Sequence, residues 1–139
     1  MTRPRPFRHG LVIGKFFPPH RGHAFLVRSA APFCDRVTVG VFGHPSTTLP
    51  LELRAEALAE VAAPYGNVRV VAAADTVPID YDDPAIWDRH VAIFRDGVAR
   101  ALAQEGLTPE ACPVDAVFTS EAYGAELARR FGCRHVEVD

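Results

Sequence analysis

The sequence predicts a doubly wound α/β fold, in which helices cover both faces of a five-stranded parallel sheet. Short apolar or β-branched runs alternate along the chain with longer segments of helical periodicity. The first run, at residues 11–13, is continuously apolar, as expected of a strand buried on both faces of a parallel sheet. At 139 residues we expect one domain over residues 1–139, opened by a basic leader at residues 1–8.

The first half of the chain reads as two βα units. A strand is expected at residues 10–16 and a helix at about 22–32, followed by a second strand at 37–42. Turn-forming residues then make a loop, 43–48, after the carboxyl end of that strand. Pro50 lies in the first turn of a second helix that ends near residues 64–66.

The second half continues the alternation, with a third strand at residues 68–73 and a polar, turn-rich segment at 74–83. Asp83 and Pro84 supply the N-cap and first turn of a third helix, which ends near Gly106. The remaining elements are a strand at 114–118, a helix capped by Ser120 and ended by Gly132, and a short strand at 135–138. The first strand would then be central, where the strand order reverses and ligands of open α/β sheets bind.

Composition and charge narrow the function classes. Hydrophobic residues make up 48% of the chain and charged residues 23%, without an apolar run of membrane-spanning length or a signal peptide, so we expect a cytoplasmic protein. Cys34, Cys112 and Cys133 are scattered, which predicts neither disulfides nor a zinc site. Residues 1–36 carry a net charge of +6 (seven cations, one anion) and the rest −8 (eight against sixteen). This asymmetry favours a small polyanion as ligand over nucleic acid.

Residues 9–23, HGLVIGKFFPPHRGH, carry cations and imidazoles from a strand to the start of a helix. Such a helix end presents unpaired N–H groups and partial positive charge, which predicts a phosphate site. Lys15 is the only lysine among fifteen cationic residues, which indicates a compact charge at this place, although a solvated position is the simpler alternative. The glycine-rich patterns of dinucleotide and P-loop sites are absent. His20 and His23 lack further ligands at metal-binding spacing, so no resident metal is expected.

The run GKFFPPHRGH at residues 14–23 resembles the G-x-F-x-P-x-H-x-G-H signature of the nucleotidyltransferase superfamily. Within it, the chain is most similar to nicotinamide-mononucleotide (NMN) adenylyltransferases of the archaeal and NadR types, supported by Trp87 and by residues 118–121, FTSE. The resemblance implies a Rossmann-like sheet of the nucleotidyltransferase/HUP type in the order 3-2-1-4-5. It also implies transfer of AMP from ATP to NMN, giving NAD and pyrophosphate, with Mg²⁺ accompanying ATP.

The resemblance implies a role for each matching position. His20, His23 and Lys15 would be catalytic and would hold the ATP phosphates. Other ATP contacts would come from Gly14, Phe16, Phe17, Gly22, Arg54, Thr119, Ser120 and Glu121, and the acceptor nucleotide would contact Trp87, Phe42 and Gly43. From the residues alone, Trp87 reads as core, Arg54 as a solvated face and residues 119–121 as a helix cap. His9, His44, His90 and His135 are interpreted as structural or surface residues.

The family carries a further helix with an I-S-G-T-x-x-R motif after its fifth strand, and this sequence stops at Asp139, before it. We therefore expect either a fragment or a weakened triphosphate site. Two alternatives to the NMN reaction stay open: a non-catalytic nucleotide-binding or regulatory domain, and a sibling transferase with another phosphorylated acceptor. The expected partners are ATP, NMN and NAD, with neither nucleic acid nor membrane; a homo-oligomer stays open.

Overall fold

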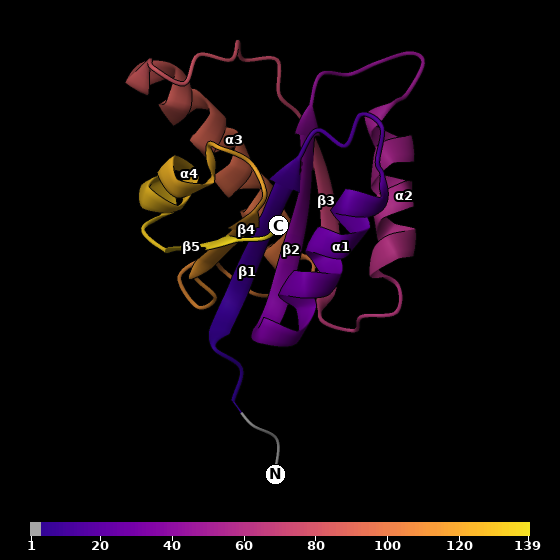
Figure 1. Cartoon of the computed structure of the whole chain (residues 1–139), viewed down its shortest axis with the longest axis vertical. Coiled ribbons are helices and arrows are strands. Elements are labelled where there is room, and N and C mark those ends of the chain that lie inside the picture. The colour runs from indigo at the N-terminus through magenta and orange to yellow at the C-terminus, as the bar shows by residue number, and fades with distance from the viewer. Residues whose placement is uncertain (1–3) are drawn as a thin grey trace.

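A computed structural model describes residues 4–139 and contains a five-stranded sheet in the order β3-β2-β1-β4-β5. All neighbouring strands pair in parallel, and helices lie on both faces of the sheet (Figure 1). The strands are β1 (Phe7–Gly14), β2 (Cys34–Gly43), β3 (Val68–Ala74), β4 (Ala116–Thr119) and β5 (Arg134–Glu137). The helices are α1 (Arg21–Ala30), α2 (Leu51–Ala62), α3 (Pro84–Ala103) and α4 (Gly124–Phe131). The predicted fold class and strand order are confirmed.

Two hydrophobic cores lie on opposite faces of the sheet. Leu11 packs in the core beneath α3 and α4, whereas Val12, the next residue of β1, packs in the core beneath α1 and α2. Successive residues of a strand point to opposite faces, so a central strand covered on both sides must be apolar at every position. This explains the continuous apolar run that marks β1 in the sequence.

The start of the chain differs from the expected basic leader at residues 1–8. Residues 1–3 lie outside the described part, and β1 already begins at Phe7, three residues before the predicted strand. Arg5 donates hydrogen bonds to the carbonyls of Ala31 and Cys34, at 3.3 and 2.7 Å. This part of the leader is therefore tied to the corner between α1 and β2.

Two of the predicted helix boundaries in the second half of the chain are confirmed, and one predicted cap is wrong. The Asp83 carboxylate accepts a hydrogen bond from the Ala85 N–H at 2.9 Å, which confirms the predicted cap of α3. Gly132 ends α4 in the left-handed conformation, φ 69°, as predicted. The prediction that Ser120 caps this helix is wrong, because α4 begins only at Gly124 and its N-cap residue, Tyr123, makes no side-chain capping bond.

The parallel strands bring three loops to one edge of the sheet. The loops that follow β1, β2 and β3 lie together at the top of Figure 1, above the carboxyl ends of these strands.

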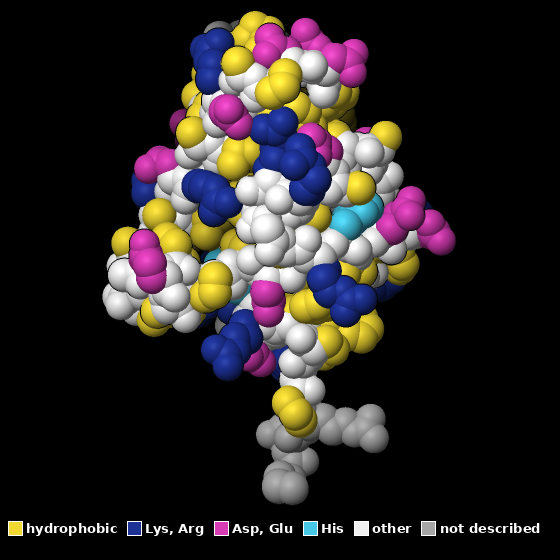
Figure 2. Space-filling view, turned by 90° about the vertical axis from the view of Figure 1, so that its left-hand side faces the viewer, with side chains coloured by type: hydrophobic (Ala, Val, Ile, Leu, Met, Phe, Trp, Pro, Cys, Tyr) yellow, Lys and Arg dark blue, Asp and Glu magenta, His cyan; other side chains and the backbone are white. Residues whose placement is uncertain are grey.

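On the side face shown in Figure 2, basic and acidic side chains are interspersed rather than gathered into a broad basic surface. Within residues 4–139, no helix combines the length and the apolarity that crossing a membrane requires.

Candidate active site

The turn from β1 to α1 depends on a strained and buried phenylalanine. Phe16 has a φ of 51°, in the left-handed region that bulky residues rarely adopt, and its side chain is only 2% exposed. The sequence placed this residue in the strand, but β1 ends at Gly14. A Cβ atom on Gly14 would lie 3.1 Å from the Phe16 ring, so glycine leaves room for the ring to fold back against the strand.

Two histidines cap the N-terminus of α1, and we call this pair the imidazole cap (His20 and His23). The His20 Nδ1 accepts a hydrogen bond from the Gly22 N–H at 3.1 Å, and the His23 Nδ1 accepts one from the His20 N–H at 3.0 Å. The two rings stack with centroids 3.7 Å apart. A Cβ atom on Gly22 would lie 2.9 Å from the His20 ring, so the glycine of the motif permits this cap.

The cap corrects the expectation of bare backbone donors at this helix end, because His20 already binds the Gly22 N–H. Burial, and to a lesser extent the neighbouring His20 imidazole, lowers the pKa of His23 to about 4. Since each Nδ1 acts as an acceptor, the proton of each neutral ring must lie on Nε2. The imidazole cap therefore offers a pair of Nε2–H donors, supported by the positive end of the helix dipole.

Arg54 is not on the solvated face that the residues alone indicated, and its contact with the nucleotide stays a prediction. Its side chain is 1% exposed, and its guanidinium donates to the carbonyls of Lys15, His44 and Leu49, at 3.0, 2.6 and 3.1 Å. It also lies over the ring of Phe17, 5.1 Å from the centroid. Arg54 thus joins the loop after β1 to the loop after β2, which makes it an organising residue of the site.

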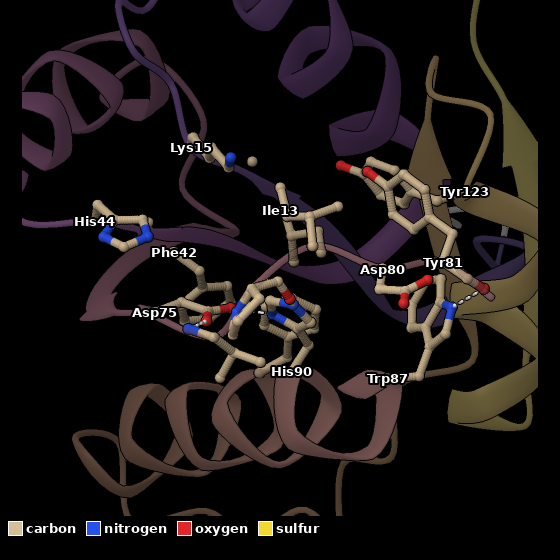
Figure 3. A pocket seen from close by; sticks show the side chains of 16 residues that line it. Ile13, Lys15, Phe42, His44, Asp75, Asp80, Tyr81, Trp87, His90 and Tyr123 are labelled. Atoms are coloured by element: carbon tan, nitrogen blue, oxygen red, sulfur yellow. Dashed lines mark hydrogen bonds and ion pairs between the residues drawn. The ribbon is translucent and has the colours of Figure 1, made fainter. Parts of the chain in front are cut away.

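Beside these loops lies a cavity of about 300 Å³, which we call the aromatic cavity. Figure 3 shows Lys15 and His44 toward one end and Trp87, Tyr81 and Tyr123 toward the other. The lining residues are Ile13, Gly14, Lys15, Phe42, Gly43, His44, Asp75, Val77, Pro78, Ile79, Asp80, Tyr81, Trp87, His90, Phe94 and Tyr123. Five residues with predicted roles, from four separate elements or loops, are therefore brought to one cavity: Gly14, Lys15, Phe42, Gly43 and Trp87.

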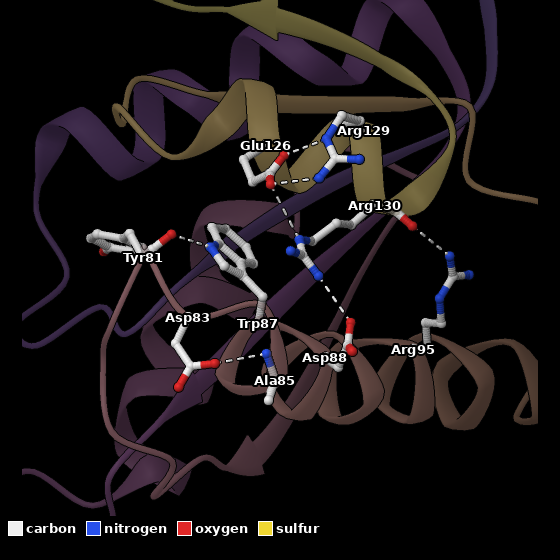
Figure 4. A network of polar contacts seen from close by, with 9 residues as sticks. All are labelled: Tyr81, Asp83, Ala85, Trp87, Asp88, Arg95, Glu126, Arg129 and Arg130. Atoms are coloured by element: carbon white, nitrogen blue, oxygen red, sulfur yellow. Dashed lines mark hydrogen bonds and ion pairs between the residues drawn. The ribbon is translucent and has the colours of Figure 1, made fainter.

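Trp87 is both a core residue and part of the cavity wall. It is 6% exposed, its Nε1–H donates to the Tyr81 carbonyl at 3.0 Å, and it packs in the core beneath α3 and α4. The Arg130 guanidinium lies 5.2 Å from the indole centroid and pairs with Asp88 at 2.9 Å (Figure 4). The indole is therefore fixed from two sides, and the two interpretations of Trp87 do not exclude each other.

Several wall residues had no functional prediction. Residues 75–81, here called the wall segment, were interpreted only as part of a polar turn region, and His90 was interpreted as structural or surface. Yet the His90 Nδ1 lies 2.5 Å from the Asp75 carboxylate and its Nε2 lies 2.9 Å from the Pro78 carbonyl. Burial raises the pKa of Tyr123, with a further contribution from Glu121. The sequence signals available were an aspartate directly after a strand and a histidine on the helix that follows.

Other predicted residues lie outside the cavity lining. The imidazole cap, Phe16, Phe17, Gly22, Arg54 and residues 119–121 are not part of it. Thr119 is 2% exposed, and its hydroxyl lies 3.1 Å from the His135 Nε2, so that side chain has a structural partner. His9 is likewise buried against the Cys112 carbonyl and the Thr38 hydroxyl. Within residues 4–139, no group of three or more His, Cys, Asp or Glu side chains is arranged to hold a metal ion.

Comparison with known proteins gives one sequence likeness and one fold likeness. No family model matches the chain. The chain is 36% identical over 73 residues to the phosphopantetheine adenylyltransferases of Streptococcus uberis and Streptococcus pneumoniae. These matches cover 51% of this chain and 44% and 45% of the relatives, so the chain matches less than half of their length.

Among solved structures, NadR in complex with NR matches 99% of this chain and 38% of its own, with a TM-score of 0.64 and 23% identity. A bifunctional NMN adenylyltransferase/ADP ribose pyrophosphatase from Francisella tularensis, complexed with AMP and a manganese ion, matches 95% and 37%, with a TM-score of 0.61 and 17% identity. The chain resembles the nucleotidyltransferases. At these identities the structural likeness concerns the fold, whereas the sequence likeness supports the nucleotidyltransferase superfamily over half of the chain.

Lys15 links the two parts of this candidate site. It follows β1 directly, it lines the aromatic cavity, and its carbonyl is held by Arg54. The imidazole cap follows five residues later in the same turn, where the buried Phe16 ring meets the His23 ring edge-on with centroids 4.6 Å apart. The arrangement thus provides a set of cationic and N–H donors next to a cavity with aromatic walls.

Proposed function

We propose that this chain is an adenylyltransferase domain that transfers AMP from ATP to a phosphorylated acceptor. The observation that carries the proposal is the imidazole cap, in which both Nδ1 atoms are engaged by backbone N–H groups. This leaves two Nε2–H donors, in rings stacked at the positive end of α1, for a phosphate chain. Lys15 adds a point charge between this cap and the aromatic cavity.

The proposed reaction needs positioning and charge stabilisation rather than a general base. An acceptor phosphate has a second pKa of about 6, so it is largely ionised at pH 7. One of its oxygens forms a bond to the α-phosphorus of ATP, and the bond from that phosphorus to the bridging oxygen breaks, releasing pyrophosphate. His20, His23 and Lys15 would stabilise the negative charge on the phosphate oxygens and the departing pyrophosphate. Mg²⁺ would arrive with ATP and neutralise part of that charge.

The cavity favours NMN as acceptor. Trp87, Tyr81 and Tyr123 supply aromatic surface at one end, with the Asp80 carboxylate beside Trp87 and Tyr81, while Lys15 lies toward the other (Figure 3). A cationic ring is attracted both to aromatic faces and to a carboxylate, and a phosphate is attracted to a lysine. NMN carries a cationic pyridinium ring and a phosphate, which matches this polarity. The fold likeness to NadR in complex with NR agrees with the proposal.

Phosphopantetheine is the second candidate acceptor, because the sequence likeness is to phosphopantetheine adenylyltransferases. Its arm is neutral, so the carboxylate and the aromatic faces of the cavity give it no electrostatic preference. The two acceptors therefore predict different dependence on Asp80. With Asp80→Asn, turnover of NMN should fall and turnover of phosphopantetheine should not.

The proposal is tested by incubating the chain with Mg-ATP and either NMN or phosphopantetheine while pyrophosphate release is followed. We expect release that requires an acceptor, with NMN preferred. Release with phosphopantetheine alone would assign the second acceptor. Binding of ATP without release for any phosphorylated acceptor would contradict the transferase and support a non-catalytic nucleotide-binding domain.

A further inference from the structure

The wall segment (residues 75–81) of the aromatic cavity is attached to α3 through a histidine that contacts an acceptor with each ring nitrogen. The His90 Nδ1 lies 2.5 Å from one carboxylate oxygen of Asp75, and the Nε2 lies 2.9 Å from the Pro78 carbonyl. The other Asp75 oxygen accepts the Val77 N–H at 3.0 Å. Asp75 and His90 are well covered, with side chains 6% and 16% exposed.

Both ring nitrogens of His90 are engaged by the wall segment. A carbonyl oxygen has no proton to give, so the Nε2 of His90 must carry the proton of its bond to Pro78. The second hydrogen bond joins the Nδ1 to the Asp75 carboxyl group. One side chain thus holds the segment at two points.

The same segment presents the exposed ring of Tyr81 to the cavity. Tyr81 is 58% exposed, and its ring centroid lies 5.9 Å from that of Trp87 and 5.9 Å from that of Tyr123. The segment is attached at its two ends: His90 holds residues 75 and 78, and the Trp87 Nε1–H holds the Tyr81 carbonyl. The place of the Tyr81 ring therefore depends on two side chains of α3.

Other charged and titratable groups share this cavity. Figure 3 places His90 beside Asp75 and Phe42, with the remaining groups around them. The Phe94 ring stacks near His90, with centroids 6.0 Å apart. The titratable groups that line the cavity with His90 are Asp75, Asp80 and Tyr81 of the wall segment, Lys15 after β1, His44 after β2 and Tyr123 before α4.

We propose that Asp75 and His90 form a positioning pair that holds the wall segment in place, so that recognition of the acceptor weakens when the pair is broken. The role in acceptor recognition rests on the proposed function, whereas the positioning itself does not. Removing the imidazole of His90 frees the segment from α3 at Asp75 and at Pro78. Neither residue touches the reacting atoms in this scheme; both act through Tyr81 and Trp87.

The chain has its own reporter for the positioning, because Trp87 is its only tryptophan and binds the wall segment directly. The fluorescence of the ligand-free wild type is compared with that of variants at one pH. His90→Gln should shift the Trp87 emission, because the wall segment is no longer held at Asp75 and Pro78. Asp75→Asn should keep the wild-type emission, because its amide can accept the Val77 N–H and donate to the Nδ1 of His90.

A matched control is His44→Gln, which removes another histidine lining the same cavity and should keep the wild-type emission. Wild-type emission in His90→Gln, or the same shift in Asp75→Asn as in His90→Gln, would overturn the proposal. These readings need no ligand, so they decide the positioning even if no acceptor is ever turned over.

The second measurement adds NMN and Mg-ATP. We expect the NMN KM of His90→Gln to rise about tenfold, as for one lost hydrogen bond to a charged group, while the ATP KM stays unchanged. The NMN KM of Asp75→Asn should stay close to that of the wild type. An equal rise of both KM values in His90→Gln would contradict a role confined to the acceptor.

Discussion

The imidazole cap and the aromatic cavity are neighbours that are built in different ways. The cap arises within one turn, from residues 20–23, and its hydrogen bonds join positions two or three residues apart. The cavity is assembled from the ends of β1 and β2, the residues that follow them, the wall segment, α3 and the residue before α4. Local construction gives the cap a fixed geometry, whereas the cavity depends on contacts between distant segments that can be loosened separately.

This difference separates the two tasks that the proposed transfer reaction requires. Phosphates are alike in every nucleoside triphosphate, so a preformed set of donors serves the phosphate chain. An acceptor must be discriminated, and the cavity offers aromatic, acidic and imidazole groups whose positions depend on the wall segment. We therefore expect substitutions in the cap to lower turnover and substitutions in the cavity to change acceptor affinity.

The largest expected effect is on the cap. His23→Ala should reduce turnover by about 10²–10³-fold, the usual cost of removing one donor that stabilises developing charge. Steady-state rates of pyrophosphate release measure this. Arg28→Ala, which removes an exposed cation from the last turn of the same helix, is the control and should keep wild-type rates. Wild-type turnover in His23→Ala would show that the cap does not act on the phosphates.

The next largest effect is expected on stability, when Arg54, which joins the loop after β1 to the loop after β2, is replaced. Arg54→Met should lower the free energy of unfolding by about 2–4 kcal/mol, because three carbonyls lose a charged donor inside the protein. Chemical denaturation measures this loss. Arg129→Met removes a largely exposed arginine that pairs with Glu126, and it should lower the free energy of unfolding far less than Arg54→Met. Similar losses for both variants would contradict an organising role for Arg54.

Within the cavity, Trp87→Phe keeps an aromatic ring but removes the bond from Nε1 to the Tyr81 carbonyl. We expect the acceptor KM to rise about fivefold, which corresponds to about 1 kcal/mol for one hydrogen bond, with the ATP KM unchanged. Steady-state kinetics with each substrate varied in turn test this. If the ATP KM rose instead, Trp87 would belong with the phosphate region.

The smallest effect is a pH dependence of stability that arises in the cap. The folded-state pKa of His23 is about 4, below the ordinary value of about 6.5 expected in the unfolded chain. The unfolded state therefore binds a proton more readily, and this contribution to stability is lost as the pH falls from about 6.5 through about 4. His23→Asn should show a shallower decline in denaturation experiments over this range. An identical decline would contradict the assignment.

The features that could be predicted from the sequence are those built from local contacts, and the features that could not be predicted depend on contacts between distant segments. The motif at residues 14–23 predicted that Lys15, His20 and His23 lie around the turn from β1 to α1, because its residues are adjacent and its turn chemistry is local. The strand order and the helix-covered sheet followed from the alternation of patterns along the chain. Asp75 and His90 could not be paired from the sequence, because their contact depends on how the segment after β3 folds over α3.

Three residues were predicted in the wrong structural place, and each of these errors has a physical reason. From the residues alone Arg54 looked like a solvated cation, since nothing local predicts that three carbonyls converge on it. Phe16 looked like a strand residue because it is apolar, yet its positive φ turns the chain toward α1. Ser120 looked like a helix cap by residue type, but α4 starts four residues later.

The central claim is that the imidazole cap binds the ATP phosphates and the aromatic cavity binds the acceptor. Calorimetric titration of wild type, His23→Ala and Tyr81→Ala with a non-hydrolysable ATP analogue and, separately, with NMN tests it most directly. The account predicts that His23→Ala weakens binding of the ATP analogue and leaves NMN binding unchanged, with the reverse for Tyr81→Ala. If both variants weakened the same ligand, or if NMN bound none of the three proteins, the account would be contradicted.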